Sequence, residues 1–331
     1  MLAQDTTLHS ATEQIDAVRA QIHRVIVGHE RVVDGVLNAL LSGGHVLLEG
    51  VPGLGKTTLL RTLGRALHLD YSRIQFTPDL MPADILGSFV MDTNQLGAKA
   101  LRFEKGPVFA HLVLADEINR ATPRTQSALL EAMQEKTVTS GTTTHLLDEP
   151  FLVMATQNPL EMEGTYPLPE AQLDRFLLKL LVEYPEREDL TAIVDRTADT
   201  TPLEVDAILD RDQILELRRA ASQTLVAPHV RDYAISLVLA TQPRPGREHA
   251  LARKYVRYGS SPRGAQALVL CGRVRALMQG RLHVSTEDVR ELALPALRHR
   301  IILNFDAHAD GRTEDDLLLE MLESLPEPTM P

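Results

Sequence analysis

The sequence of 331 residues contains a single cysteine, Cys271, and no tryptophan, and aromatic residues make up only 4% of it. One cysteine excludes an internal disulfide and a metal site built from several cysteines. The scarcity of aromatic rings leaves few platforms on which nucleic-acid bases could stack. Apolar runs such as 46–48 and 112–115 are far shorter than the roughly 20 residues of a membrane-spanning helix, so we expect no membrane span.

Basic residues are also fewer than acidic ones: the sequence has 34 Lys and Arg and 45 Asp and Glu, which gives a formal charge of −11. Such a balance repels phosphate backbones at long range and makes nonspecific nucleic-acid binding unlikely on charge alone. The first nine residues lack a basic start followed by an apolar stretch, so we expect no secretory signal and a cytoplasmic location. Twelve histidines are scattered without the spacing of metal ligands.

The order of expected elements predicts an α/β fold. Ser10 and Glu13 form a capping pattern that predicts the start of a first helix. Strands and helices then alternate, which predicts a mainly parallel sheet covered by helices on both faces. The expected helices here are 31–41, 58–68 and 126–134, and the expected strands are 45–49, 72–76, 112–115 and 151–156.

Two segments interrupt this alternation, and the end of the chain departs from it. Strand-like 89–91 and 100–103 flank one turn, and 137–139 and 142–146 flank another, so we expect two β-hairpins, within 86–107 and 136–150. From 186 onward the pattern is helical, with expected helices at 186–198, 210–223, 229–241, 262–279, 286–299 and 313–324. We therefore expect a first domain over 1–185 and a helical second domain over 186–331.

A glycine-rich loop follows the first expected strand and precedes a helix. It reads Gly50-Val-Pro-Gly-Leu-Gly55-Lys56-Thr57, which matches the phosphate-loop pattern of nucleotide-binding proteins. In such loops backbone amides curl around phosphate oxygens, the lysine neutralises the β- and γ-phosphates, and the threonine hydroxyl is placed for Mg²⁺. We expect ATP or ADP to bind to Gly50, Val51, Pro52, Gly53, Leu54, Gly55, Lys56, Thr57 and Thr58.

Polar residues also follow two other expected strands. Asp116 and Glu117 end the apolar strand 112–115, and Asn158 follows the strand 151–156. Ligands of parallel sheets collect at the carboxyl edge of the strands, so we expect these side chains beside the phosphates. Asp116 is suited to holding the Mg²⁺ shell with Thr57, Glu117 to activating a water for attack on the γ-phosphate, and Asn158 to holding that water.

Six segments of the sequence belong to one known pattern: the phosphate loop, 76–87, 115–121, 125–135, 155–159 and 168–176. Taken together, they resemble the AAA+ superfamily, and most closely its MoxR family of ATPases. The resemblance covers about 10–300. It implies that the helical second domain is a lid, that Asn158 is a first sensor, that Arg175 is an arginine finger offered to the ATP of a neighbouring subunit, and that Arg263 is a second sensor on the lid. It also implies that Val27 and Gly28 contact the adenine.

Whether Arg263 serves its own nucleotide or that of a neighbour stays open at this point. The resemblance further implies a Mg²⁺-dependent ATPase assembled as a ring, hexameric by analogy, that remodels other proteins. MoxR-like chaperones often act with partners bearing a von Willebrand factor A domain, in maturing protein complexes or inserting metal cofactors. Two alternatives remain: a motor stimulated by nucleic acid, and a nucleotide-gated scaffold with little turnover.

Overall fold

The computed structural model describes residues 2–93, 99–159, 164–198, 203–244 and 249–326. Its centre is a five-stranded parallel sheet in the strand order β2-β5-β8-β1-β9. The predicted α/β fold with a parallel sheet is confirmed. The bounds are Val46–Glu49 for β1, Tyr71–Gln75 for β2, Leu112–Asp116 for β5, Leu152–Gln157 for β8 and Leu178–Leu181 for β9.

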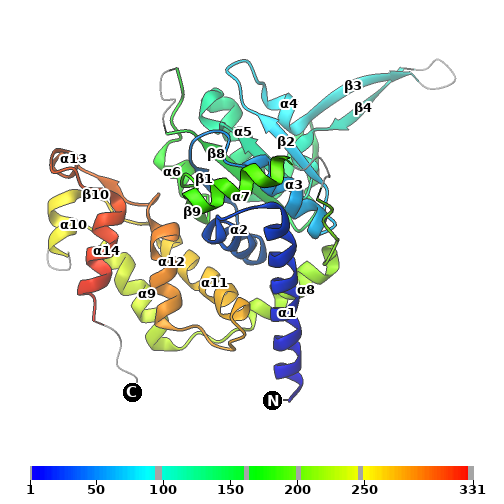
Figure 1. Ribbon diagram of the computed structural model, residues 1–331. Helices are drawn as coiled ribbons and strands as arrows, with labels where there is room; N and C mark the ends of the chain where they lie inside the picture. Colours follow the sequence, from blue (N-terminus) through cyan, green and yellow to red (C-terminus); the bar gives the residue numbers. More distant parts are fainter. Residues whose placement is uncertain (1, 94–98, 160–163, 199–202, 245–248, 327–331) are drawn as a thin grey trace.

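Side chains of the central strands alternate between two hydrophobic layers, as the pleat requires. Leu112 and Leu114 of β5 point into a core with α1, α2 and α3, whereas Val113 and Ala115 point into a core with α5. Both faces of the sheet are therefore covered, as Figure 1 shows. The helix bounds are Leu2–Val25 for α1, Glu30–Ser42 for α2, Lys56–Ala66 for α3, Pro82–Leu86 for α4 and Pro123–Glu135 for α5.

The first helix begins earlier than the sequence predicts. The helix α1 passes through Ser10 without a break, so the prediction that Ser10 caps its start is wrong. The residues before Ser10 include neither glycine nor proline. Nothing in that segment therefore interrupts the helical hydrogen bonds, and a capping-type pattern inside such a segment does not start a helix.

Two β-hairpins form where the sequence predicts them; the strands of the first are longer than expected, and the second spans the expected residues. The strands β3 (Gly87–Thr93) and β4 (Lys99–Lys105) form an arm that projects from the body of the molecule (Figure 1). The shorter hairpin comprises β6 (Thr137–Ser140) and β7 (Thr143–Leu146). Most of the turn predicted for the first hairpin, 94–98, lies outside the described residues.

The chain after β9 is mainly helical, as predicted, and the division into domains at 186 stays a prediction. Two short helices, α10 and α13, and a two-stranded sheet were not predicted. Among the described residues, no helix combines the length and apolar character needed to cross a membrane. The bounds are Arg187–Ala198 for α7, Arg211–Ser222 for α8, Pro228–Ala240 for α9, Ala250–Tyr255 for α10, Pro262–Met278 for α11, Thr286–Leu297 for α12, Phe305–Ala309 for α13, Glu314–Ser324 for α14, Val256–Tyr258 for β10 and Ile302–Leu303 for β11.

A buried histidine, His45, joins the sheet to α5. Its Nδ1 accepts a hydrogen bond from the amide of Val153 at 3.0 Å, so its Nε2 carries the proton and donates to the carbonyl of Met133 at 3.0 Å. Burial, with a smaller contribution from the charges of Lys136 and Arg218, lowers the pKa of His45 from an ordinary value of 6.5 to about 4. The ring is therefore neutral in the folded protein at neutral pH.

We expect acid to destabilise the fold through His45. Between about pH 6.5 and pH 4 the ring is protonated in the unfolded chain but stays neutral in the folded chain. The free energy of unfolding should therefore fall as pH drops through this window, by at most about 3 kcal/mol from this residue. Urea unfolding at pH 7, 6 and 5 measures the slope. The slope should shrink in His45→Gln but not in His283→Gln, an exposed control; equal slopes in all three proteins would contradict this account.

Candidate functional site

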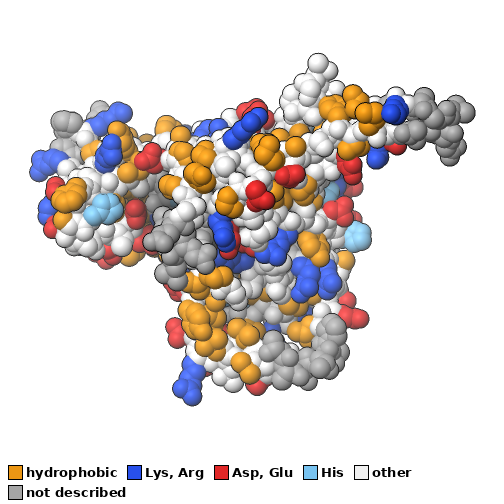
Figure 2. All heavy atoms as spheres, turned by 90° about the horizontal axis from the view of Figure 1, so that it is seen from above, with side chains coloured by type: hydrophobic (Ala, Val, Ile, Leu, Met, Phe, Trp, Pro, Cys, Tyr) orange, Lys and Arg blue, Asp and Glu red, His pale blue; other side chains and the backbone are white. Residues whose placement is uncertain are grey.

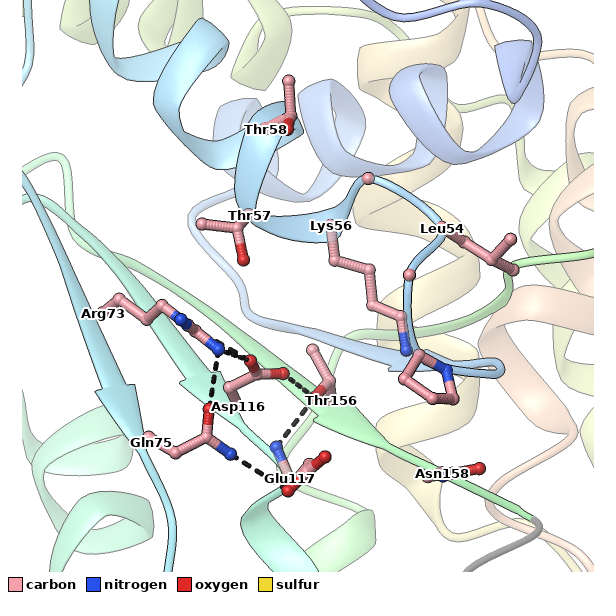
Figure 3. Close-up of a pocket in the computed structure, with 13 residues that line it drawn as sticks. Leu54, Lys56, Thr57, Thr58, Arg73, Gln75, Asp116, Glu117, Thr156 and Asn158 are labelled. Carbon is pink, nitrogen blue, oxygen red and sulfur yellow. Dashed lines mark hydrogen bonds and ion pairs between the residues drawn. The ribbon is translucent and has the colours of Figure 1, made fainter. Parts of the chain in front are cut away.

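A cavity of about 360 Å³ lies at the carboxyl ends of β2, β5 and β8, where the glycine-rich loop leads into α3. Figure 3 shows the residues of the loop on one side of this cavity and those of the strand ends on the other. The structure thus brings the two predicted halves of the site together. Its lining consists of Pro52, Gly53, Leu54, Gly55, Lys56, Thr57, Thr58, Arg73, Gln75, Asp116, Glu117, Thr156 and Asn158.

The shape of the loop depends on glycine at two kinds of position. Gly55 precedes the first residue of α3 and has φ +76°, a left-handed conformation that side chains disfavour. Gly50 is required by space instead, because a Cβ there would lie 2.5 Å from the carbonyl oxygen of Val182 after β9. The loop therefore ends at the start of α3, whose first residues line the cavity. The first amides of a helix have no partner within the helix, and such amides bind anions.

Lys56, the first residue of α3, extends across the loop. Its Nζ donates a hydrogen bond to the carbonyl of Gly50 at 2.6 Å. Burial lowers the pKa of Lys56, whereas the nearby carboxylates of Asp116 and Glu117 raise it. The Lys56 cation thus lies beside the loop and opposite two carboxylates, an arrangement that fits a phosphate chain carrying a metal.

Asp116 and Glu117 point in different directions although they are adjacent. Asp116 is the last residue of β5, and its Oδ1 accepts a hydrogen bond from the hydroxyl of Thr156 on β8 at 2.7 Å. Glu117 takes a left-handed conformation, with φ 56°, and its amide donates to the same hydroxyl oxygen at 2.8 Å. Thr156 is buried, so it fixes both acidic residues at the edge of the sheet.

The carboxylate of Glu117 is held by two donors. Its Oε2 accepts hydrogen bonds from Gln75 Nε2 and from Arg120 Nη1, each at 3.0 Å. Asn158, which is 5% exposed, lines the cavity at the end of the neighbouring strand β8. The site therefore offers a positioned carboxylate and an amide on the side of the cavity that faces the phosphate loop.

The donor set of the cavity fits Mg²⁺. The hydroxyl of Thr57 and the carboxylate of Asp116 line the same space, and oxygen atoms of this kind are the ligands that Mg²⁺ prefers. Among the described residues, no cluster of three or more His, Cys, Asp or Glu could hold a metal. Mg²⁺ is commonly bound by one or two protein oxygens together with substrate phosphates, and this cavity matches that pattern.

Gly50 and Val51, at the start of the loop, do not line the cavity, and four further residues predicted to act on the nucleotide lie away from it. Val27 and Gly28 lie before α2, and a Cβ on Gly28 would lie 2.6 Å from a carboxylate oxygen of Asp189 on α7. Arg175 follows the short helix α6 (Glu170–Leu173) and donates from Nη1 to the carbonyl of Leu130 at 2.8 Å. None of these three residues lines the cavity, so their roles stay predictions.

The fourth, Arg263, lies at the start of α11 and approaches the segment that carries Arg175. Its Nη1 is 3.4 Å from Oδ2 of Asp174, the residue before Arg175. The same carboxylate accepts hydrogen bonds from Ser261 and from the buried Arg300, at 2.9 Å from each nearest donor. The helical part of the chain therefore holds the Arg175 segment directly, and Arg263 belongs to that contact in this structure.

Three residues of the cavity were not predicted: Arg73, Gln75 and Thr156. The residues of β2 alternate, so that Tyr71, Arg73 and Gln75 share one face and Ile74 is buried on the other. Polar residues at alternate positions near the carboxyl end of a strand indicate a ligand site, and this signal could have identified Arg73 and Gln75 as site residues. Thr156 ends the predicted strand 151–156, and its place at the carboxyl end of a parallel strand is the signal that could have identified it.

Comparisons with known proteins agree with this site. Residues 45–178 match a family model described as "ATPase family associated with various cellular activities (AAA)", and 248–321 match one described as "AAA lid domain". The chain is 43% identical over 305 residues to the protein named Chaperone MoxR1 of Mycobacterium tuberculosis, covering 92% of this chain and 80% of that one.

Two further relatives extend along nearly the whole chain. Protein MoxR of Paracoccus denitrificans is 35% identical, covering 86% of this chain and 87% of its own. A crystal structure of a protein from Cytophaga hutchinsonii superposes with a TM-score of 0.91 at 39% identity and covers 98% of both chains. The predicted resemblance is thereby confirmed, and the chain belongs to the MoxR family of AAA+ ATPases.

Proposed function

We propose that this protein hydrolyses ATP with Mg²⁺ at the subunit interfaces of a hexameric ring and uses the reaction to remodel partner proteins. The observation that carries the ATPase proposal is the single cavity in which Lys56, Thr57, Asp116, Glu117 and Asn158 meet. ATPase activity is a trait of the family, and each of these residues has a chemical task in it.

The tasks follow from the positions of the side chains. Lys56 and the amides at the start of α3 neutralise the phosphates, which lowers the cost of placing negative charge on the leaving group. Thr57 and Asp116 would hold Mg²⁺, which supplies further charge stabilisation when it is bound. Glu117 orients and deprotonates the attacking water, and Asn158 holds that water in line with the γ-phosphate.

The hairpins favour a protein as the object of remodelling. Phe103 of β4 stacks on His145 of β7, with ring centroids 4.3 Å apart, so the two hairpins pack together. Beside this contact Met91, Leu101 and Leu146 are 66%, 71% and 77% exposed. Figure 2 shows hydrophobic side chains on the projecting arm. Exposed apolar groups of this kind suit contact with an unfolded segment of another protein.

The partner proposal rests on the relatives and on charge. The name of the Mycobacterium tuberculosis relative describes a chaperone. A partner with a von Willebrand factor A domain, and a role in maturing protein or metal-cofactor complexes, are the specific forms that we propose. The formal charge of −11 favours protein over nucleic acid. Because β4 also carries Lys99, Arg102 and Lys105, a nucleic acid remains the competing outcome of the test.

We expect a permanently unfolded polypeptide to stimulate phosphate release by the intact protein. Replacing Met91 and Leu101 together with serine should remove most of the stimulation and leave the basal rate unchanged, because these side chains lie on the arm and outside the cavity. Leu319→Ser, at an exposed apolar residue of α14, is the matched control and should keep the stimulation. Stimulation by single-stranded DNA instead, falling steeply with salt, would favour the nucleic-acid motor.

A further inference from the structure

One cation of the cavity has no task in the proposed reaction. Arg73 lies on β2, at the edge of the sheet, and its guanidinium reaches Oδ2 of Asp116 on the neighbouring strand β5. The two contacts measure 2.6 Å from Nη2 and 3.2 Å from Nε. Nη2 also donates to Oε1 of Gln75 at 2.6 Å, which holds the guanidinium in place.

This contact occupies one oxygen of the carboxylate that we assign to the metal. The other oxygen of the carboxylate, Oδ1, already accepts the hydroxyl of Thr156. In Figure 3 the hydroxyl of Thr57 points toward the space where Arg73 meets Asp116. The two residues assigned to Mg²⁺ therefore face the space beside the guanidinium. A metal held there and the guanidinium would compete for the carboxylate of Asp116.

The ion pair of Arg73 and Asp116 can separate at little cost in free energy. The side chain of Arg73 is 48% exposed, whereas that of Asp116 is 18% exposed and tied to Thr156. Half-exposed ion pairs contribute little free energy because water screens them. A divalent ion that is also bound by nucleotide phosphates can therefore replace the guanidinium, while Asp116 keeps its position.

We propose that Arg73 is a stand-in cation: it holds Asp116 in the absence of metal and gives this carboxylate up when a divalent metal arrives with the nucleotide. This inference rests on the proposed function, since it assumes that Asp116 serves the metal. Before the metal binds, Arg73 offsets the negative charge of the adjacent Asp116 and Glu117. It also adds a positive charge to the cavity that receives the phosphates.

The proposal predicts opposite effects on metal and on metal-free nucleotide. In Arg73→Gln the competitor is gone, so the complex with ADP should bind Mn²⁺ more tightly, by about fivefold, as expected for the loss of one partly exposed ion pair. Binding of ADP in the presence of EDTA should become weaker instead, because the cavity has lost a positive charge. Arg73→Lys, which keeps the charge, should stay near wild type in EDTA.

The experiment measures free Mn²⁺ by electron paramagnetic resonance in the presence of saturating ADP, and ADP binding in EDTA by the fluorescence of a labelled analogue. The matched control is Arg120→Gln, which removes the positive charge that pairs with Glu117, the residue next to Asp116. An increase in Mn²⁺ affinity of similar size in Arg120→Gln, or no increase in Arg73→Gln, would overturn the role of Arg73.

A separate arm tests the assumption beneath the proposal. Asp116→Asn should weaken Mn²⁺ binding to the ADP complex, because it removes the carboxylate charge from the metal site. If Asp116→Asn weakens Mn²⁺ binding while Arg73→Gln leaves Mn²⁺ binding unchanged, the metal site is supported and only the role of Arg73 as a stand-in cation fails. If Asp116→Asn leaves Mn²⁺ binding unchanged, the metal site of the proposed function fails, and the inference fails with it.

Discussion

Replacing Glu117 with glutamine should lower the rate of ATP hydrolysis about a thousandfold while leaving ATP binding and ring assembly close to normal. Glu117 lines the cavity, and in the proposed function its carboxylate takes a proton from the attacking water. Glutamine has the same shape, so its carbonyl oxygen can still accept the hydrogen bonds that Gln75 and Arg120 donate in this structure. The change therefore removes basicity and keeps the geometry.

Phosphate release and the affinity for a fluorescent ATP analogue measure the two halves of this prediction. The matched control is Glu131→Gln, at an exposed glutamate on α5, which should leave both unchanged. Turnover near the wild-type rate in Glu117→Gln would show that another group activates the water. Loss of ATP binding together with turnover would show that Glu117 holds the site together instead.

Much of the phosphate cavity could be predicted from sequence because its chemistry is local. The loop that ends at Lys56 and Thr57 carries its own turn, cation and hydroxyl within eight residues, and a strand and a helix flank it in the expected order. Asp116 and Glu117 could be placed because the carboxyl ends of parallel strands meet at one edge of a sheet. Predicting that Lys56, Thr57, Asp116 and Glu117 lie at one site therefore required no knowledge of the strand order.

What could not be predicted depends on that order. Arg73 meets Asp116 because β2 lies beside β5, and nothing within the segment of β2 states which strand is its neighbour. The strand β9 was missed because its four residues follow directly on the segment that carries Arg175 and show no turn signal of their own. Likewise, the contact of Arg263 and Arg300 with Asp174 joins residues about 90 and 126 positions apart.

Arg175 lies outside the phosphate cavity of its own chain, and this placement leads to the second large prediction. We expect Arg175→Ala to lower hydrolysis about a thousandfold, as the loss of an arginine finger does, while ATP still binds. Lys56→Ala should instead lose binding and hydrolysis, because its ammonium group lies in the cavity itself. Each variant alone should therefore be almost inactive.

Mixed rings of the two variants should regain activity if Arg175 acts on the neighbouring subunit. In a ring with head-to-tail interfaces, a competent interface needs an Arg175→Ala subunit with intact Lys56 beside a Lys56→Ala subunit with intact Arg175. Random mixing in equal amounts places these neighbours in the required order at about a quarter of the interfaces. Phosphate release should thus approach a quarter of the wild-type rate and peak at equal amounts.

The decisive control is a mixture of Lys56→Ala with Glu117→Gln. Lys56 and Glu117 line the same cavity, so each of these subunits is damaged in its own site and no arrangement of neighbours repairs it. This mixture should stay inactive at every ratio, whereas the mixture with Arg175→Ala should not. Rescue in both mixtures would point to subunit contacts in general, and rescue in neither would place the role of Arg175 within its own chain. Rescue only in the mixture that separates Lys56 from Arg175 would require that one ATP be served by two subunits.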